Sequence, residues 1–552
     1  MKRVAIFGAG VAGLSAAHEF ARQGYQVDVY ETNAETGGFF RSARNQQDNG
    51  MPSEYSWHGI GPWYHNVFDV MRQIPFDKTG SVYDKALSRP IAFGLVPDEV
   101  SATFGQDYIF KKPKAFRMTA RDKLSLGWGL AKTWTSNKRT QEDYALKNAS
   151  EYWHGRMTDK GWKTWRATFG PWIGSDWANA SLHHVGLFFR KNLMSGETHK
   201  HPADKQGDAW THGSADGWLL LNGPSSEWWF DKWVIHLKNN NVTFHMNQEL
   251  KKLDYDGNQI TGAKLTNGKN VNADVYILAT TPFAVVDILQ RTPRLASIKQ
   301  LNKFKDLTQD GPHTQVSFRI AFGENILWKK DRSAVVLADS EYNLTLFAEE
   351  QVWDRSVSLG RGVSSLWTGT ACVSNTPGRV HGKPLDTCTK QEFIDEITAQ
   401  IMECRGLEYM IKEANNGRTL KNFSIIRIEV WSEWVFSPKG IKPKQPKWVT
   451  SSKTQPHLPT QKTPIANLAL AGAHTKTDAD IWSIESAVES GRKAAQVFEP
   501  SISIIPAHKS MALQIIGRAD DLSYSIGGPH ILIVTAVGIA ASLLYVLFRL
   551  MH

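Results

Sequence analysis

A chain of 552 residues with 41% hydrophobic and 21% charged residues can bury a large core and should divide into at least two domains. This composition excludes an intrinsically disordered protein. The net charge is +10 and the three cysteines (Cys372, Cys388 and Cys404) form no C-x-x-C pair, so we expect free thiols in a reducing compartment rather than a disulfide framework.

The first forty residues are typical of a strand, a glycine turn, a helix and a second strand. An apolar run at 4–7 leads into Gly8-Ala9-Gly10-Val11-Ala12-Gly13, which has the G-x-G-x-x-G spacing. A helix is predicted over 14–23 and a second strand over 25–30, ending at Glu31. This βαβ unit predicts a dinucleotide site, with the glycine turn and the helix N-terminus at the pyrophosphate.

Each residue of this unit has a distinct physical role. Gly8 permits the tight turn, Gly10 lets the backbone approach the pyrophosphate, and Gly13 lets the helix pack on the strand. Glu31 can accept hydrogen bonds from ribose hydroxyls, and its charge disfavours a 2′-phosphate and therefore NADP. The basic start and apolar run also resemble a signal peptide, but cleavage there would destroy the turn, so we expect a mature cytosolic N-terminus.

The segment after Glu31 carries the first resemblance to a known family. Gly37-Gly38-Phe39-Phe40-Arg41 resembles the flavin-containing amine oxidoreductase superfamily, in which a glycine pair and an arginine lie along the cofactor. The stretch 54–66, which contains Trp57 and His58, resembles the segment of plant-type carotene desaturases that runs beneath the flavin ring. The chain resembles phytoene and carotene desaturases and bacterial hydroxysqualene dehydroxylases in these segments. The resemblance implies bound FAD, with Gly37, Gly38, Arg41 and Trp57 among its contacts.

Residues 67–204 resemble the helical substrate-domain insertion of the desaturase-like group. We expect the tryptophans of this part to be core residues, with a pocket for a large apolar substrate as the alternative. They are Trp153, Trp162, Trp165, Trp172 and Trp177. Residues 291–459 return to the substrate side, with strands predicted at 314–322, 334–338 and 344–348, a helix at 390–404 and a loop at 440–463.

Two basic runs fall in these substrate regions. Such runs usually lie on solvated faces, and attraction to anionic lipid headgroups is the alternative. No nucleic-acid module is present, so nucleic acid is not an expected partner. The runs comprise Lys111, Lys112, Lys114, Arg117 and Arg121, and then Lys439, Lys442, Lys444, Lys447, Lys453 and Lys462.

Two further segments resemble parts of the superfamily's cofactor domain. The strand at 273–282 follows a hairpin region in which the family pattern implies that Leu250 brackets the adenine through its backbone. Near the end, Gly472 closes a strand, and a helix follows from Ser483 with the family's "S-x-E-x-A-x-x-S-G" pattern. Its N-terminus carries a partial positive charge and favours reduced flavin, with the Ile484 N–H as the candidate donor.

One position departs from the family pattern. Relatives place an acid directly after Ala-Gly to bind the ribityl chain, whereas this chain has Ala473-His474. Either His474 replaces that hydrogen bond or flavin binding is weakened, and we expect binding to be retained.

The tail carries an apolar run from Ile531 to Phe548, 18 residues without a charge, which would span about 27 Å as a helix. We therefore expect a single-pass membrane anchor, with the catalytic body on the cytoplasmic side of an ER-type membrane if the cell is eukaryotic.

The expected fold is α/β, with a Rossmann-type FAD-binding domain interleaved with a mixed α+β substrate domain and followed by a C-terminal transmembrane helix. The FAD-binding domain comprises 1–66, 205–290 and 460–498, and the substrate domain 67–204 and 291–459. A tether at 499–528 precedes the anchor at 529–550.

The expected function is that of an FAD-dependent oxidoreductase that accepts hydride from an apolar or lipid-like substrate, as an isoprenoid or carotenoid desaturase does. The FAD is expected to be non-covalent and the electron acceptor is open. One alternative is an FAD-dependent amine oxidase. Another, from a different class, is a non-catalytic prenyl or lipid escort of the same fold.

A flavin needs little acid–base help from its protein, and the sequence shows no metal-binding or nucleophile motif. Candidate general acids or bases are Glu54, His58, Asp478 and Asp480.

Overall fold

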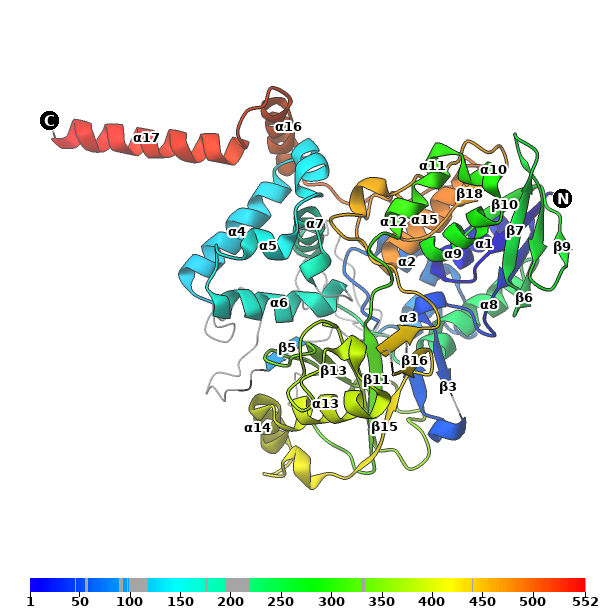
Figure 1. Cartoon of the computed structure of the whole chain (residues 1–552), viewed down its shortest axis with the longest axis horizontal. Coiled ribbons are helices and arrows are strands. Elements are labelled where there is room, and N and C mark those ends of the chain that lie inside the picture. The colour runs from blue at the N-terminus through cyan, green and yellow to red at the C-terminus, as the bar shows by residue number, and fades with distance from the viewer. Residues whose placement is uncertain are drawn as a thin grey trace.

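The structure is a computed structural model that describes residues 1–44, 46–54, 58–88, 93–96, 98, 118–173, 177–194, 218–328, 333–438 and 440–551. Three parts are visible in Figure 1: a parallel sheet with its helices near the N-terminus, a second sheet beside α13 and α14, and a helical part from which the C-terminal helices extend. Trp57 lies outside the described residues, as do Lys111, Lys112, Lys114, Arg117 and Lys439.

The first sheet is entirely parallel and draws its strands from distant segments. Its order is β18-β10-β1-β2-β6. The predicted strands at the N-terminus, near 275 and near 468 are confirmed, and they are almost fully buried, as expected for a parallel sheet covered on both faces. The strands are β1 (Arg3–Phe7), β2 (Gln26–Glu31), β6 (Val242–Met246), β10 (Val275–Leu278) and β18 (Leu468–Leu470).

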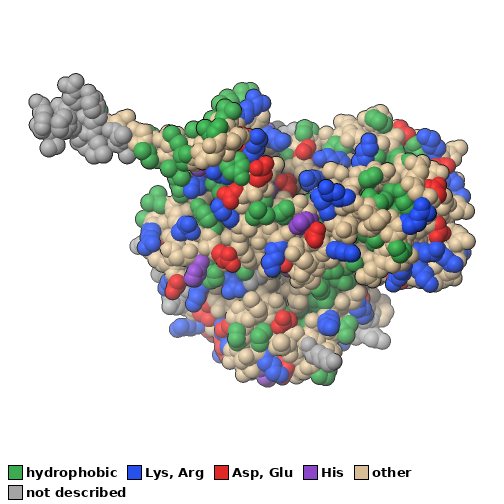
Figure 2. Space-filling view, turned by 45° about the horizontal axis from the view of Figure 1, so that its top comes forward, with side chains coloured by type: hydrophobic (Ala, Val, Ile, Leu, Met, Phe, Trp, Pro, Cys, Tyr) green, Lys and Arg blue, Asp and Glu red, His purple; other side chains and the backbone are tan. Residues whose placement is uncertain are grey.

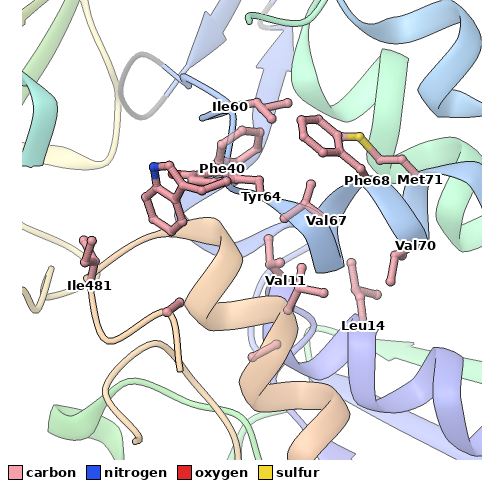
Figure 3. Close-up of a cluster of buried hydrophobic side chains, with 14 of the residues drawn as sticks. Val11, Leu14, Phe40, Ile60, Tyr64, Val67, Phe68, Val70, Met71 and Ile481 are labelled. Atoms are coloured by element: carbon pink, nitrogen blue, oxygen red, sulfur yellow. The ribbon is translucent and has the colours of Figure 1, made fainter. Parts of the chain in front are cut away.

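The helices α1 (Val11–Arg22) and α15 (Ile484–Gln496) pack directly against each other although they are far apart in the sequence. Gly491 makes this contact possible, because a Cβ there would lie 2.2 Å from the Ala12 carbonyl oxygen. Figure 3 shows Val11 of α1 within a buried cluster that includes Val67 of α2 (His65–Gln73). The glycine turn that starts α1 and the helix α15 therefore share one core.

The second sheet is mostly antiparallel, in the order β15-β11-β14-β13-β12-β5. The strands predicted near 314, 334 and 344 and the helix near 390 are confirmed. Strand β5 pairs in parallel with β12 and brings the chain before the helical part onto this sheet. The elements are β5 (Phe93–Val96), β11 (Val316–Phe322), β12 (Ala334–Leu337), β13 (Leu344–Ala348), β14 (Ser365–Ala371), β15 (Ile425–Val430), α13 (Lys390–Met402) and α14 (Arg405–Ala414).

The helical part has a core rich in tryptophan. Trp153 and Trp165 are 0% and 1% exposed, so the core interpretation holds for both. The helices are α4 (Ala120–Trp134), α5 (Ala149–Trp153), α6 (Asp159–Ile173) and α7 (Leu182–Leu193).

Short elements complete the described fold. They are α3 (Val82–Ala86), α8 (Asp231–Lys238), α9 (Pro282–Gln290), α10 (Pro293–Ala296), α11 (Lys299–Asn302), α12 (Phe304–Leu307), β3 (Ser42–Arg44), β4 (Pro52–Glu54), β7 (Leu250–Tyr255), β8 (Ile260–Leu265), β9 (Asn270–Val271), β16 (Trp434–Ser437) and β17 (Gly440–Pro443). The expected division into domains stays a prediction.

The tail contains two helices, α16 (Met511–Ser525) and α17 (Ile531–Met551). Within the expected tether, α16 packs on the helical part: the Asp521 carboxylate accepts from the Asn137 N–H at 3.1 Å, and Asp520 pairs with Arg139 at 3.2 Å. In the space-filling view of Figure 2 the described part of α17 projects from the body.

The predicted transmembrane helix is wrong. Among the described residues, no helix combines the length and apolarity needed to cross a bilayer. Moreover, the helix start is tied to the protein body, because the Ile531 N–H donates to buried Asp520 at 2.9 Å.

Candidate functional site

A cavity of about 520 Å³ lies at the carboxyl end of the parallel sheet and extends to the start of α15. We call it the central cavity. It brings together most of the residues that the sequence predicts for cofactor binding, including Gly10 and Ile484. The predicted residues in its lining are Gly8, Gly10, Val11, Ala12, Glu31, Gly37, Gly38, His58, Leu250, Gly472, His474 and Ile484.

The glycine turn after β1 has room for a ligand at one position only. Gly8 has φ +108°, and a Cβ there would lie 2.5 Å from the Ala279 carbonyl oxygen. A Cβ on Gly13 would lie 1.9 Å from the Gly8 carbonyl oxygen, so this residue serves helix–strand packing. At Gly10 a Cβ would meet only Gly38 Cα, at 3.7 Å. Gly10 therefore offers the open backbone surface that a pyrophosphate needs.

Glu31 lies at the tip of β2 and is 7% exposed. Its carboxylate accepts hydrogen bonds from the Ala9 N–H at 2.7 Å, the Asn33 N–H at 3.0 Å and the Asn33 side-chain amide at 2.6 Å. A carboxylate has about four acceptor positions, so one stays available for a ribose hydroxyl. Glu31 thus also stabilises the glycine turn, whose backbone would bind the ligand.

Arg41 is not among the residues that line the central cavity. Its guanidinium donates to the Gly38 carbonyl at 2.7 Å, pairs with Glu433 at 3.5 Å and packs over the Trp431 ring. It therefore supports the Gly37-Gly38 turn from behind. Its predicted direct contact with the cofactor stays a prediction.

The N-terminus of α15 opens onto the central cavity. Ser483 caps the helix by accepting from the Ser486 N–H, and the preceding N–H groups of the first turn, including that of Ile484, have no intrahelical partner. Glu485 turns away and accepts three hydrogen bonds from Asn66 and Val67. Burial raises its pKa to about 7. The helix end facing the cavity therefore presents donors and partial positive charge.

His474 is 3% exposed and its Nε2 has no hydrogen-bond partner among the described residues. Burial lowers its pKa to about 3, so the ring is neutral. It lies against Gly472, where a Cβ would be 2.3 Å from the imidazole. A neutral imidazole with an unused ring nitrogen fits a hydroxyl or carbonyl of a ligand. The replacement of the family's acid by His474 stays a prediction.

Sequence reasoning missed Lys447 and Trp448, which line the same cavity. Lys447 belongs to a basic run expected on a solvated face, but it is 5% exposed and its ammonium donates to Gln315. Burial lowers its pKa to about 8. The other described lysines of that run are exposed. The apolar residue Trp448, directly after Lys447, is the only feature of the sequence that indicates burial of this lysine. In Figure 2 Lys and Arg are spread over the visible face and interspersed with acids.

The candidates Glu54 and His58 form one pair. The Glu54 carboxylate lies 2.5 Å from His58 Nδ1 and accepts from the Ser225 N–H at 3.0 Å. The His58 ring stacks on Phe40 with 3.8 Å between ring centroids. The buried carboxyl of Glu349 lines a small cavity next to this pair, and burial raises its pKa well above the usual range. Of the two candidates, His58 lines the central cavity, whereas Glu54 lines the small one.

Asp478 and Asp480 lie elsewhere. Asp480 accepts from His183 at 2.8 Å and from Gln455 at 3.0 Å. Burial alone would raise the pKa of Asp480, but the charge and hydrogen bond of His183 outweigh it, and the pKa is lowered. Both acids line a second cavity, which is separate from the central cavity. The described residues contain no group of three or more His, Cys, Asp or Glu that could hold a metal ion.

Comparisons with known proteins agree with this geometry. The family described as "NAD(P)-binding Rossmann-like domain" matches residues 6–74, and "Flavin containing amine oxidoreductase" matches 233–497. The zeta-carotene desaturase of Arabidopsis thaliana is 24% identical over 94% of this chain and 89% of its own length. A probable zeta-carotene desaturase of Synechococcus elongatus is 25% identical over 90% and 98%.

Solved structures share the fold at lower identity. Cyclohexylamine oxidase from Brevibacterium oxydans has a TM-score of 0.55 at 14% identity and covers 90% of this chain and 99% of its own. An oxidoreductase from Methanosarcina mazei has a TM-score of 0.56 at 13% identity and covers 90% and 100%. The donor set of the central cavity, with its open glycine backbone, free helix end and unpartnered imidazole, fits FAD.

Proposed function

Because the chain belongs to the flavin-containing amine oxidoreductase superfamily and is an FAD-dependent oxidoreductase, we propose that it is a desaturase. In this proposal it removes two hydrogens from adjacent carbons of a long apolar substrate, of isoprenoid or carotenoid type, and leaves a carbon–carbon double bond. The FAD is held without a covalent bond: all three cysteines are buried and none is among the described residues of the central cavity.

The observation that carries the proposal is that one cavity contains both Gly10 of the first turn and Ile484 of the last helix of the body. A single FAD can contact both only if these segments face the same space. When bound, FAD supplies a two-electron acceptor for hydrogen from carbon. The protein chain places the hydrogen-bond donors that hold the FAD.

The chain's own residues divide the remaining work. Gly10 and the first turn of α1 hold the pyrophosphate through backbone N–H groups. Leu250 holds the adenine through its backbone. The N-terminus of α15 and the neutral His474 donate to the oxygen-bearing parts of the cofactor. Lys447 holds a positive charge in the cavity below pH 8 and can release a proton near that pH.

Aromatic side chains support an apolar substrate. Phe40, Tyr64 and Trp218 line the cavity near His58, and Trp448 and Trp482 line it near α15. Their rings exclude water and give apolar contact area without a charge. The names of the similar desaturases support the same substrate class.

The test is to add substrate to the purified flavoprotein under anaerobic conditions and to follow reduction of the flavin by its absorbance near 450 nm. We expect the protein to be yellow and to lose this colour when a carotenoid that still has saturated bonds is added. The absorbance maximum of the carotenoid product should lie at a longer wavelength. Bleaching by amines alone, with hydrogen peroxide on re-oxidation, would replace the proposal with an amine oxidase. A protein that takes up no FAD on reconstitution would overturn both and favour the escort of the same fold.

A further inference from the structure

A second cavity, of about 150 Å³, lies between α7, residues 477–480 and the start of α16. We call it the α7–α16 cavity. None of its lining residues lines the central cavity. Its polar and charged lining residues are Thr133, Ser136, Asn137, Thr140, Gln141, His183, Arg190, Lys191, Thr477, Asp478, Asp480, His508, Lys509, Ser510 and Gln514.

The basic side chains of this cavity are only partly neutralised. Arg190, Lys191 and Lys509 face two carboxylates that are already engaged. Asp480 binds His183 and Gln455 with its two oxygens, and Asp478 lies 3.7 Å from Lys493. Among the described residues that line the cavity, positive charge is therefore in excess.

The guanidinium of Arg190 makes no hydrogen bond or ion pair with any residue in the described part of the chain. It is largely enclosed by protein, and burial lowers its pKa while the charge of Asp480 opposes that shift. Five N–H donors in such surroundings are costly unless a ligand accepts from them.

Two neighbouring groups have the same character. Lys191 is 4% exposed, and its ammonium donates to the Asp478 carbonyl at 2.6 Å and lies over the Trp63 ring. Burial lowers its pKa to about 8. His183 is also 4% exposed, and its Nδ1 has no hydrogen-bond partner among the described residues.

The start of α16 adds backbone donors on the opposite wall. Ser510 occupies the N-cap position without a side-chain cap hydrogen bond, and the first turn contains no acidic residue. The N–H groups of this turn and the positive helix end are therefore unneutralised, which is the usual arrangement at a bound anion.

We propose that the α7–α16 cavity binds a phosphate group. Arg190 binds two of its oxygens, the ammonium of Lys191 a third, and the N-terminus of α16 closes the site. The volume lies below the roughly 300–1,000 Å³ of pockets for drug-sized ligands, so the ligand is inorganic phosphate or a small phosphomonoester. This site does not depend on the proposed desaturation.

A bound phosphate joins α7 to α16 and so holds the C-terminal segment on the helical part. It also contacts residues of the 477–480 turn, next to the 472–474 and 482–484 residues of the central cavity. Occupancy is therefore expected to raise thermal stability.

The experiment is calorimetric titration of the full-length flavoprotein with inorganic phosphate at constant ionic strength, set by chloride, together with ³¹P NMR. We expect submillimolar binding, at least tenfold weaker in Arg190→Gln. Lys509→Gln, at an exposed position, should weaken binding two- to fivefold without a folding defect. Lys269→Gln, in the exposed turn between β8 and β9, is the matched control and should bind as the wild type does.

Several outcomes separate the possibilities. Glycerol 3-phosphate binding more tightly than inorganic phosphate assigns the site to a phosphomonoester, and the reverse assigns it to free phosphate. No binding by the wild type overturns the proposal. Equal affinity in wild type, Lys509→Gln and Arg190→Gln, with unchanged near-ultraviolet circular dichroism, also overturns it.

Discussion

The central cavity and the α7–α16 cavity share one segment, residues 472–484, but their walls are built differently. The central cavity presents backbone groups of glycine turns and of a helix start, surrounded by aromatic rings. The α7–α16 cavity presents charged side chains from helices far apart in the sequence. A site built from backbone groups requires glycines at fixed spacings, and these are visible in the sequence. A site built from side chains of distant helices has no such spacing.

The largest expected effect comes from Gly13→Ala. A Cβ at this position would lie 1.9 Å from the Gly8 carbonyl oxygen, and backbone cannot yield without moving the turn. We expect loss of bound flavin and a large drop in folded yield. Gly127→Ala in α4 has nothing within 4 Å and should stabilise the fold by up to about 1 kcal/mol. Flavin absorbance per protein and thermal melting measure both, and wild-type flavin content in Gly13→Ala would contradict the packing role.

The substitution Gly10→Ala should affect ligand binding in the central cavity but not in the α7–α16 cavity. Gly10 has φ −72° and space for a Cβ beside Gly38, so the fold should form, but the methyl group would occupy the surface proposed for the pyrophosphate. We expect FAD to bind at least tenfold more weakly, about 1.4 kcal/mol, while phosphate titrates the α7–α16 cavity as in the wild type. Unchanged FAD affinity would remove the pyrophosphate from this turn.

His474→Ala removes one buried donor from the central cavity. A single hydrogen bond contributes about 0.5–1.5 kcal/mol, so FAD affinity should fall about three- to tenfold. The matched variant is His508→Ala, which removes an exposed histidine from the other cavity and should leave FAD affinity unchanged. Fluorescence of released flavin measures both, and equal loss in the two variants would mean that the effect of His474 is not local.

The two cavities should both respond to pH near 8 but in separable ways. Burial lowers the pKa of Lys447 and of Lys191 to about 8, so each ammonium loses its proton as the pH rises through 8. We expect the absorbance of bound flavin to shift with that midpoint, and Lys447→Met to abolish the shift. Phosphate affinity should decline severalfold over the same range in both proteins. A flavin shift that survives in Lys447→Met would assign it to another group.

The smallest effect is expected from His58→Gln. The pair of His58 with Glu54 and its stacking on Phe40 are structural contacts, so turnover should change less than about threefold. General acid–base catalysis contributes about 100- to 10,000-fold. A loss of that size in kcat, with KM unchanged, would make His58 a catalytic residue.

Much of the cofactor region could be predicted from the sequence, for a physical reason. Gly8, Gly13 and Glu31 act within one βαβ unit, where spacing determines geometry. Ile484 could be placed because a helix start has the same chemistry whatever side chain it carries.

Other residues could not be placed in this way. Lys447 looked like one of several surface lysines, since burial depends on the core around Trp448 and not on the local run. Asp480 was grouped with Glu54 and His58 as a candidate, yet it faces the α7–α16 cavity. The sequence alone does not show on which side of the segment 472–484 a side chain lies. The apolar run at 531–548 has the composition of a membrane span, but none of the described helices combines the length and apolarity needed to cross a bilayer.

The packing of α1 on α15 has a consequence for synthesis of the protein. The first strand and turn leave the ribosome early, but Gly491 and the helix that covers Ala12 are made almost five hundred residues later. A nascent chain therefore carries an incomplete pyrophosphate turn, with one side of α1 uncovered, for most of translation. Contacts so distant in sequence form late, so we expect cofactor loading to wait until α15 has been made and has left the ribosome.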